Sequence, residues 1–246
     1  MDSEIYEEMF RLEQVHWWFQ ARAKIVLELL RRYLPAAAPE ETQIADLGCG
    51  CGLMLALLRD RSYKAIGMDA FDEAIAFSAR RGVVVEKGFL PDRLPFEEGR
   101  YDAALLLDVL EHLDDDTNAV AAAARLLKPG GILLCTVPAY QWLWAKRDEH
   151  HQHKRRYSRA RFRALFEIPS LKIETVTYYN TTLFPIAAAT RLATRIRPPE
   201  DEATDLRLPP GPINAMLEST FAMERHFIGR IPLPFGLSLL SVSRRL

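Results

Sequence analysis

Short apolar runs alternate with amphipathic stretches along most of the chain, from Ile44 onward. The apolar runs have the length of buried strands, and the stretches between them have helical spacing. The predicted strands cover residues 43–47, 64–68, 83–86, 103–107, 131–137, 172–179 and 237–244. The predicted helices cover residues 52–60, 72–81, 116–127 and 158–166. This alternation is typical of parallel βαβ units, so we predict an α/β fold with a seven-stranded, mostly parallel sheet and helices on both faces.

Two further segments are predicted to be helical but lie outside this alternation. Residues 4–34 carry a stripe of apolar side chains at helical spacing before Pro35. Residues 181–232 contain helix-like runs at 184–196 and 213–229, separated by a proline-rich stretch. We expect a single domain, 1–246, made of four parts. These are an N-terminal helical cap (1–39), a ligand-binding core (40–180), an insertion that forms a lid or substrate wall (181–232) and the last strand (233–246).

Composition narrows the class of protein. Of the 246 residues, 49% are hydrophobic and 26% are charged, so the chain can bury a core. The 32 Lys and Arg are balanced by 33 Asp and Glu, which argues against DNA as a partner. The apolar runs are too short for a transmembrane segment, and the acidic start of the chain is unlike a signal peptide. Three cysteines suggest no disulfide framework, so we expect a cytoplasmic protein.

The sharpest motif is a glycine loop at residues 44–52, where an apolar strand runs into Gly48, Gly50 and Gly52 and then into a helix. Such a loop lets a ligand approach the backbone and the N–H groups of a helix start, which is typical of a nucleotide-type site. Leu53 stands where the dinucleotide fingerprint has its third glycine, and no phosphate-loop Gly-Lys-Ser/Thr occurs.

Two acids accompany the loop. Asp46 can meet a cationic amino group or order the loop. Asp69 lies 21 residues after Gly48, at the end of the second predicted strand, where a carboxylate reaches ribose hydroxyls in this class of fold.

These segments resemble the class I S-adenosylmethionine (SAM)-dependent methyltransferases, in the type 11/12-like branch. Further similar motifs follow in order: Ile66–Asp69, Leu94–Phe96, Tyr101–Asp102, Leu107–Leu113 and Leu126–Gly131. The resemblance implies a Rossmann-like fold in which residues 40–180 bind SAM and release S-adenosylhomocysteine as the product. It implies cofactor contacts from Arg22, Asp46, Gly48, Cys49, Gly50, Gly52, Asp69, Ala70, Phe89, Leu90, Asp108, Val109 and His112. Many relatives carry an acid after the third strand, where this chain has Gly88-Phe89-Leu90, so we expect backbone groups and Phe89 to hold the adenine.

Methyl transfer from a sulfonium is an in-line displacement, so a base is needed only if the acceptor must lose a proton. The candidate catalytic residues are His112, His153 and Tyr157. His153 and Tyr157 belong to a segment similar to the D-x4-H-x-R-R-Y pattern of the same branch. This segment can supply a base (His153), bind an acidic acceptor (Arg155, Arg156) or close over the cofactor. The alternative is a solvated basic helix start capped by Ser158.

Two other features have open interpretations. The spacing of Asp148, His150, His151 and His153 matches no standard zinc pattern, so we expect no metal. The aromatic run 16–19 with Arg22 either covers the cofactor, with Arg22 on its methionine carboxylate, or packs as ordinary helix.

The predicted function is methyl transfer to a small-molecule substrate, at an oxygen of an aromatic, apolar or acidic metabolite. The alternative is a SAM-binding regulatory module without transferase activity. Leu53 disfavours a nicotinamide oxidoreductase, and Asp108–Glu111 lacks the N/D-P-P-Y/F motif of amino-methylating DNA enzymes. The basic run 146–163 leaves RNA open. Aromatic residues of the insertion suit an apolar acceptor, a homodimer contact, or a carrier-protein or lipid contact.

Overall fold

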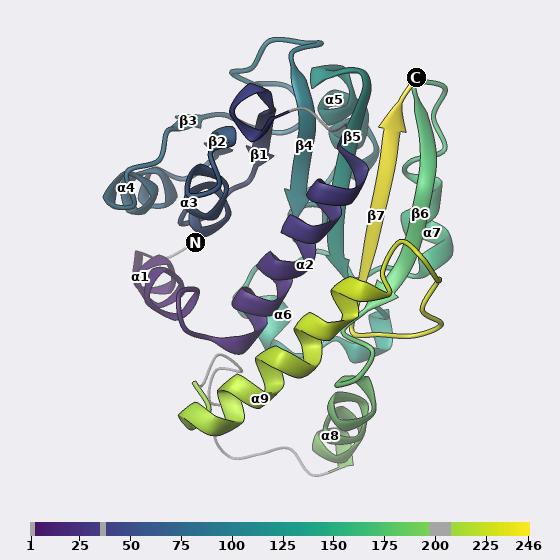
Figure 1. The fold of residues 1–246 in the computed structure, drawn as a ribbon. Helices are drawn as coiled ribbons and strands as arrows, with labels where there is room; N and C mark the ends of the chain where they lie inside the picture. Colours follow the sequence, from purple (N-terminus) through teal and green to yellow (C-terminus); the bar gives the residue numbers. More distant parts are fainter. Residues whose placement is uncertain (1–2, 35–37, 197–207) are drawn as a thin grey trace.

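The computed structural model describes residues 3–34, 38–196 and 208–246. Its centre is one seven-stranded sheet with the order β3-β2-β1-β4-β5-β7-β6, in which β7 alone runs antiparallel to its neighbours (Figure 1). The strands are β1 (Gln43–Leu47), β2 (Lys64–Asp69), β3 (Val85–Lys87), β4 (Tyr101–Leu107), β5 (Leu127–Pro138), β6 (Leu171–Tyr179) and β7 (Ser238–Arg245). The predicted seven-stranded, mostly parallel sheet is therefore confirmed.

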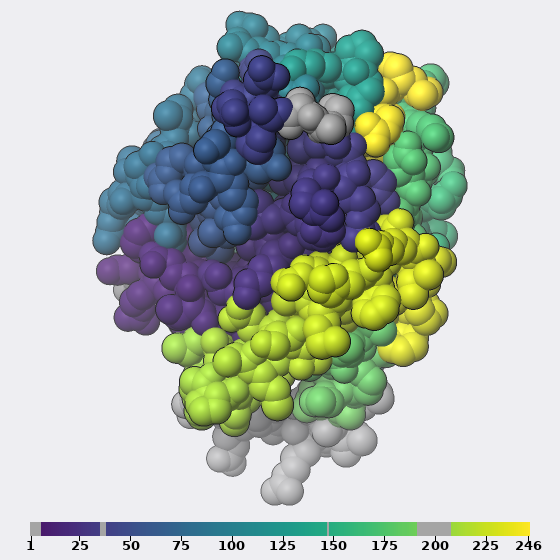
Figure 2. Space-filling view, in the orientation of Figure 1, coloured from purple at the N-terminus to yellow at the C-terminus, as the bar shows by residue number. Residues whose placement is uncertain are grey.

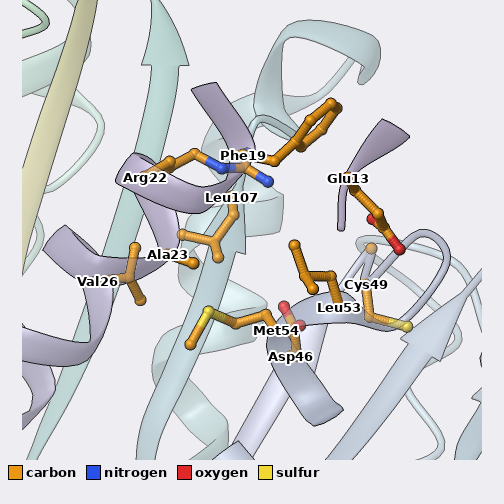
Figure 3. A pocket seen from close by; sticks show the side chains of 11 residues that line it. Glu13, Phe19, Arg22, Ala23, Val26, Asp46, Cys49, Leu53, Met54 and Leu107 are labelled. Carbon is orange, nitrogen blue, oxygen red and sulfur yellow. The ribbon is translucent and has the colours of Figure 1, made fainter. Parts of the chain in front are cut away.

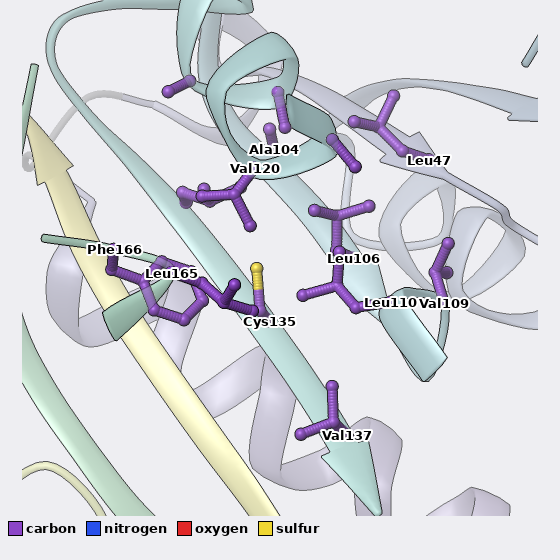
Figure 4. Close-up of a cluster of buried hydrophobic side chains, with 14 of the residues drawn as sticks. Leu47, Ala104, Leu106, Val109, Leu110, Val120, Cys135, Val137, Leu165 and Phe166 are labelled. Carbon is purple, nitrogen blue, oxygen red and sulfur yellow. The ribbon is translucent and has the colours of Figure 1, made fainter. Parts of the chain in front are cut away.

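Helices cover both faces of the sheet, as expected. The face with α2 (Trp17–Tyr33) and α3 (Leu53–Arg59) has a core that includes Ile25, Leu29 and Leu58. On the other face, α5 (Asp116–Leu126) and α7 (Arg159–Ala164) pack on the sheet. Figure 4 shows side chains of that second core, among them Cys135 and Val120. Both cores are apolar, and β4 and β5 between them lie in the middle of the sheet and are buried on both sides.

The N-terminal segment is not one helix over 4–34, as the periodicity predicted. It forms α1 (Ser3–Leu12) and α2, separated by a turn. The His16 side chain caps α2 by accepting a hydrogen bond from the Trp18 N–H at 3.2 Å. Asn214 fixes the same turn: its Oδ1 accepts from Trp17 N at 3.0 Å, and its Nδ2 donates to Val15 O at 2.8 Å. The cap and this distant residue let α1 turn away and pack against α4 (Asp72–Arg80).

The insertion packs on the cap. Its helices are α8 (Phe184–Ile196) and α9 (Gly211–Ala222), followed by the short 3-10 helix η4 (Met223–His226). The second predicted helix, 213–229, therefore ends earlier than expected. In Figure 2, α9 (yellow-green) runs across α2 (dark purple), and Lys24 pairs with Glu218 at 2.5 Å between them. The proline-rich middle lies largely outside the described residues, at 197–207.

The sheet order reverses between β1 and β4, which continue in opposite directions across the sheet. In open α/β sheets, ligands bind at such a switch point, outside the carboxyl ends of the strands. The glycine loop follows β1 and the Asp108–His112 segment follows β4, so both predicted site segments meet at this point. None of the described helices is long and apolar enough to cross a bilayer.

Candidate active site

The glycine loop turns sharply because three of its residues, Gly48, Gly50 and Gly52, have left-handed backbone. Gly48 has φ +77°, and a Cβ there would lie 2.7 Å from Val109 Cγ2. Gly52 has φ +78° and caps α3. Only glycine adopts both conformations without strain, and only a residue without a side chain lets Val109 pack this closely. The loop thus brings the ends of β1 and β4 together.

Asp69 ties the loop to the end of β2. Its two carboxylate oxygens accept from Gly50 N at 2.9 Å and from Phe71 N at 3.1 Å. Burial raises the pKa of Asp69, and these two N–H donors oppose that rise. Gly88 N donates to Asp69 O at 3.1 Å, so Phe89 and Leu90 follow directly beside Asp69 and Ala70. Phe89 is exposed and Leu90 half-buried. The structure therefore groups the residues predicted for the ribose and adenine.

A pocket lies at the switch point between α2 and the glycine loop. Arg22 from α2 and Asp46 from β1 reach into it from opposite sides (Figure 3). The pocket is lined by Glu13, Phe19, Arg22, Ala23, Val26, Asp46, Gly48, Cys49, Leu53, Met54 and Leu107. Of the predicted cofactor residues, it holds Arg22, Asp46, Gly48 and Cys49, which come from segments far apart in the sequence.

The pocket contains a buried acid, Asp46, with one oxygen that has no hydrogen bond. Asp46 is 2% exposed, and its Oδ1 has no hydrogen bond. Burial raises the pKa of Asp46 to about 7, although Arg22 opposes the rise. An unpaired buried carboxylate is costly, and a bound cation would remove that cost.

Arg22 supplies the opposite charge. It forms an ion pair with Asp108, the first residue after β4, and its guanidinium lies 4.6 Å from the centre of the Trp18 ring. Burial alone would lower the pKa of Arg22, but Asp108 outweighs it and raises the pKa. Asp108 itself has left-handed backbone, with φ +58°. A buried acid facing a paired cation is complementary to a zwitterionic amino acid.

Glu13, which the motifs did not predict, also lines this pocket. Its carboxylate pairs with Arg81 at 2.5 Å, and burial raises the pKa of Glu13 to about 7 against the effect of Arg81. Arg81 also donates to Phe10 O at 2.9 Å and to Cys51 O at 2.8 Å. These bonds hold α1 over the glycine loop, where Cys51 Sγ lies 3.4 Å from Tyr6 O.

Beside Asp108, the candidate catalytic residues form a second cluster. His112 ends the 3-10 helix η2 (Leu110–His112), and its ring centroid lies 4.8 Å from that of His153. Burial lowers the pKa of His112 to about 4, and His153 adds to the effect. Glu111 is fully buried with neither carboxylate oxygen partnered. Its pKa is raised well above the usual range by burial and by Asp108.

The loop that carries His153 follows α6 (Lys146–His150) and is held by two buried carboxylates. Asp148 accepts from His153 Nδ1 at 2.9 Å and from Arg156 at 2.8 and 3.0 Å. Burial alone would raise the pKa of Asp148, but His153 and Arg156 lower it. Arg155 pairs with Asp116 at 3.0 Å. Both arginines considered for an acidic acceptor therefore already have carboxylate partners.

Tyr157 lies beneath this cluster rather than in the pocket. It is fully buried, and its hydroxyl lies 2.8 Å from Asp116 Oδ2 and 3.0 Å from Leu110 O. Burial and Asp116 raise its pKa. Ser158 caps α7 by accepting from Arg161 N at 3.2 Å, as one interpretation of the basic run predicted.

Aromatic side chains gather where β5 and β6 end. Tyr140, which the sequence did not single out, stacks on Tyr178 at 5.2 Å and contacts Phe184 at 5.6 Å. Of the other aromatics considered for an acceptor, Tyr179 and Phe221 stack in the buried core at 5.7 Å instead. The Tyr140 cluster is therefore the best apolar wall near the catalytic candidates.

Comparison with known proteins identifies the family to which the chain belongs. A model of the methyltransferase domain family matches residues 15–173, which is more than half of the chain. The chain belongs to the SAM-dependent methyltransferase family. SAM is the cofactor of this family, and the pocket fits its amino-acid end because Asp46 and Arg22 present opposite charges.

Two curated relatives are also named as methyltransferases. The chain is 34% identical over 98 residues to a ubiquinone biosynthesis O-methyltransferase of Alkalilimnicola ehrlichii, a match that covers 37% of this chain and 40% of that protein. It is 27% identical over 168 residues to a Mycolicibacterium smegmatis protein whose name describes a SAM-dependent methyltransferase, covering 66% of this chain and 62% of the relative. The chain thus spans less than two thirds of the length of these curated relatives.

A solved structure shows the same fold. It is a chain of the complex between the Haloferax volcanii Trm112 methyltransferase activator and a methyltransferase. The TM-score is 0.63 at 22% identity, and the match covers 99% of this chain and 93% of that chain. At this identity the likeness shows the shared architecture of the methyltransferase family.

Proposed function

We propose that this chain transfers a methyl group from SAM to an oxygen of a small-molecule acceptor. The observation that carries the proposal is the pocket at the switch point, which Asp46, with its buried Oδ1 free of hydrogen bonds, lines together with Arg22. Support for an oxygen acceptor comes from a relative named as an O-methyltransferase. An acceptor of aromatic or apolar character fits the stacked rings of Tyr140 and Tyr178 near the same edge.

In this proposal the cofactor residues divide by the part of SAM they contact. Asp46 takes the amino group and Arg22 the carboxylate of the methionine end, while Asp69 takes the ribose. The loop residues Gly48, Cys49, Gly50 and Gly52 approach through the backbone. Ala70, Phe89 and Leu90 flank the adenine. Asp108, Val109 and His112 lie by the sulfonium, because they directly follow β4 at the ligand edge of the sheet.

SAM, when bound, supplies a methyl that is already activated by its positive sulfur. The chain must therefore orient the acceptor and exclude water. We assign the acceptor proton to His153: Asp148 accepts from its Nδ1, which leaves the lone pair on Nε2. Tyr157 acts as a positioning residue, since its hydroxyl contacts only Asp116 and the Leu110 carbonyl.

The surface of the insertion supports a contact role. Several large apolar side chains are exposed there: Ile186, Ile213, Met216, Met223 and Phe227. We propose that this surface meets a second copy, a carrier protein or a lipid. Light scattering and flotation with liposomes separate these occupants, and Ile213→Glu should abolish whichever contact is found. Three unpaired cysteine thiols support a cytoplasmic place of action.

Calorimetric titration of the purified chain with SAM and S-adenosylhomocysteine, with NAD as the control, tests the cofactor. We expect micromolar binding of the first two only. Transfer of labelled methyl to a panel of phenols, carboxylic acids and alcohols then tests the reaction. Binding without transfer to any acceptor class would favour the regulatory module, and NAD binding would contradict the proposal.

A further inference from the structure

Three side chains beside the pocket form a group that the methyl-transfer proposal leaves unexplained. Glu111, His112 and His153 each direct one carboxylate oxygen or ring nitrogen so that these atoms all lie within 4.8 Å of one another. Two elements supply them, η2 after β4 and the loop after α6. A backbone hydrogen bond from Lys154 N to Glu111 O, 2.8 Å long, holds the two elements together.

Glu111 indicates that this group lacks a positively charged partner. Its side chain is fully buried, and neither carboxylate oxygen has a hydrogen-bond partner. A buried carboxyl group whose two oxygens lack hydrogen bonds is unfavourable, and a bound cation would stabilise its ionised form. Arg156, the cation of the neighbouring loop, is already bonded to Asp148 through Nε and Nη2.

His153 is oriented as metal-binding histidines usually are. Its Nδ1 donates to Asp148 Oδ1 at 2.9 Å, which fixes the ring and leaves Nε2 free as a ligand. Asp148 is fully buried and also accepts from Ala145 N at 2.9 Å, so its own position is fixed. A carboxylate–histidine pair behind the ligand atom is the common arrangement around zinc and related ions.

We propose that Glu111, His112 and His153 bind one divalent transition-metal ion, and that its open position receives the acceptor oxygen. Two imidazoles and one carboxylate favour Zn²⁺, Fe²⁺ or Mn²⁺ over Mg²⁺ and Ca²⁺, which prefer all-oxygen sites. Three protein ligands leave room for a substrate, as in catalytic rather than structural sites. Spacing alone did not predict this site because 40 residues separate His112 from His153.

This inference rests on the proposed methyl transfer. The ion would define the role of His153 in that reaction. An acceptor hydroxyl in the open position has a lowered pKa and releases its proton to solvent. The oxygen then forms the new bond to the methyl carbon as the carbon–sulfur bond breaks, and that electron pair stays on sulfur. The electrons and atoms balance without an oxidant or reductant. In this arrangement the Nε2 lone pair of His153 binds the ion, so His153 acts as a ligand rather than as the base.

Metal titration of the chelator-treated full chain tests the site directly. We expect one Zn²⁺ per chain by calorimetry and by elemental analysis, and a visible absorption band when Co²⁺ replaces it. Glu111→Gln and His153→Gln should each weaken Zn²⁺ binding by about 100-fold or more. His150→Gln, at the end of α6 just before the loop of His153 and outside the group, should bind normally. Circular dichroism establishes that each variant is folded. No bound metal in the folded wild type, or equal affinity in Glu111→Gln, would overturn the site.

A second measurement separates this inference from the proposed function. SAM titration in the presence of chelator should still show binding, while methyl transfer should stop and resume on adding Zn²⁺. Transfer that continues at full rate without metal would overturn the metal role but leave the methyltransferase proposal standing. Metal binding by a chain that never binds SAM would overturn the methyltransferase proposal but leave the metal site standing.

Discussion

Arg22 of α2, which lines the pocket, forms an ion pair with Asp108, the residue that follows β4. The pair joins the N-terminal cap to the catalytic edge of the sheet, and both side chains are less than one-fifth exposed. A cation held in this way is preorganised for a second anion, so Arg22 can receive the carboxylate of the methionine end without a large rearrangement.

Replacing Arg22 should therefore weaken SAM binding. For Arg22→Ala we expect a loss of about tenfold to 100-fold, since a hydrogen bond to a charged group is worth about 1.5–3 kcal/mol. Calorimetry measures the loss. Lys24→Ala is the matched control because Lys24 lies on the same helix and pairs with Glu218 at the surface instead. Equal SAM affinity in Arg22→Ala and the wild type would remove Arg22 from the site.

SAM affinity should rise with pH because of Asp46. Burial raises the pKa of Asp46 to about 7, and only the ionised form attracts the cationic amino group. Between pH 5.5 and 7.5 the ionised fraction grows, so affinity should increase by roughly tenfold or more. Asp46→Asn should bind weakly at every pH and give a flat profile. Glu13→Gln should retain the slope, because Glu13 titrates in the same range but is paired with Arg81.

The raised pKa of Asp46 should also make the stability of the SAM-free protein fall as pH rises. An acid whose pKa is raised by folding binds more protons in the folded state, so its contribution is present below the unfolded pKa and is lost as pH rises through about 7. Chemical denaturation at pH 5 and 8 should show a larger decline for wild type than for Asp46→Asn. Equal declines would mean that Asp46 is ionised throughout.

The local parts of this site were predictable from sequence, and the long-range parts were not. Gly48, Asp46 and Asp69 stand next to apolar strands, and the ends of parallel strands meet at one edge. Glu13 and Asn214 gave no signal, because their roles depend on Arg81 and Trp17, 68 and 197 residues away. Helical periodicity likewise missed the turn between α1 and α2, since one polar cap from His16 overrides an amphipathic pattern that continues through it.

The buried pair of Glu13 and Arg81 should govern access to the glycine loop. Arg81→Ala removes the bonds by which Arg81 links Phe10 of α1 to Cys51 of the glycine loop, together with the ion pair to Glu13. We therefore expect faster amide exchange at residues 3–12 and faster SAM association. Exchange in α5 should be unchanged. Arg61→Ala is a suitable control because Arg61 donates to Leu57 O at the surface and not to α1. Unchanged exchange in α1 would show that apolar packing around Tyr6 holds the helix by itself.

Removing the hydroxyl of Tyr157 separates a positioning role from direct catalysis. Tyr157→Phe keeps the buried ring but loses the 2.8 Å contact with Asp116, so the free energy of unfolding should fall by about 1.5–3 kcal/mol. SAM affinity and the pH dependence of kcat should stay close to wild type, because Arg155 still pairs with Asp116. Tyr63→Phe, at the residue directly before β2, controls for loss of a hydroxyl. A fall in kcat of about 100-fold with unchanged stability would instead place the Tyr157 hydroxyl among the reacting groups.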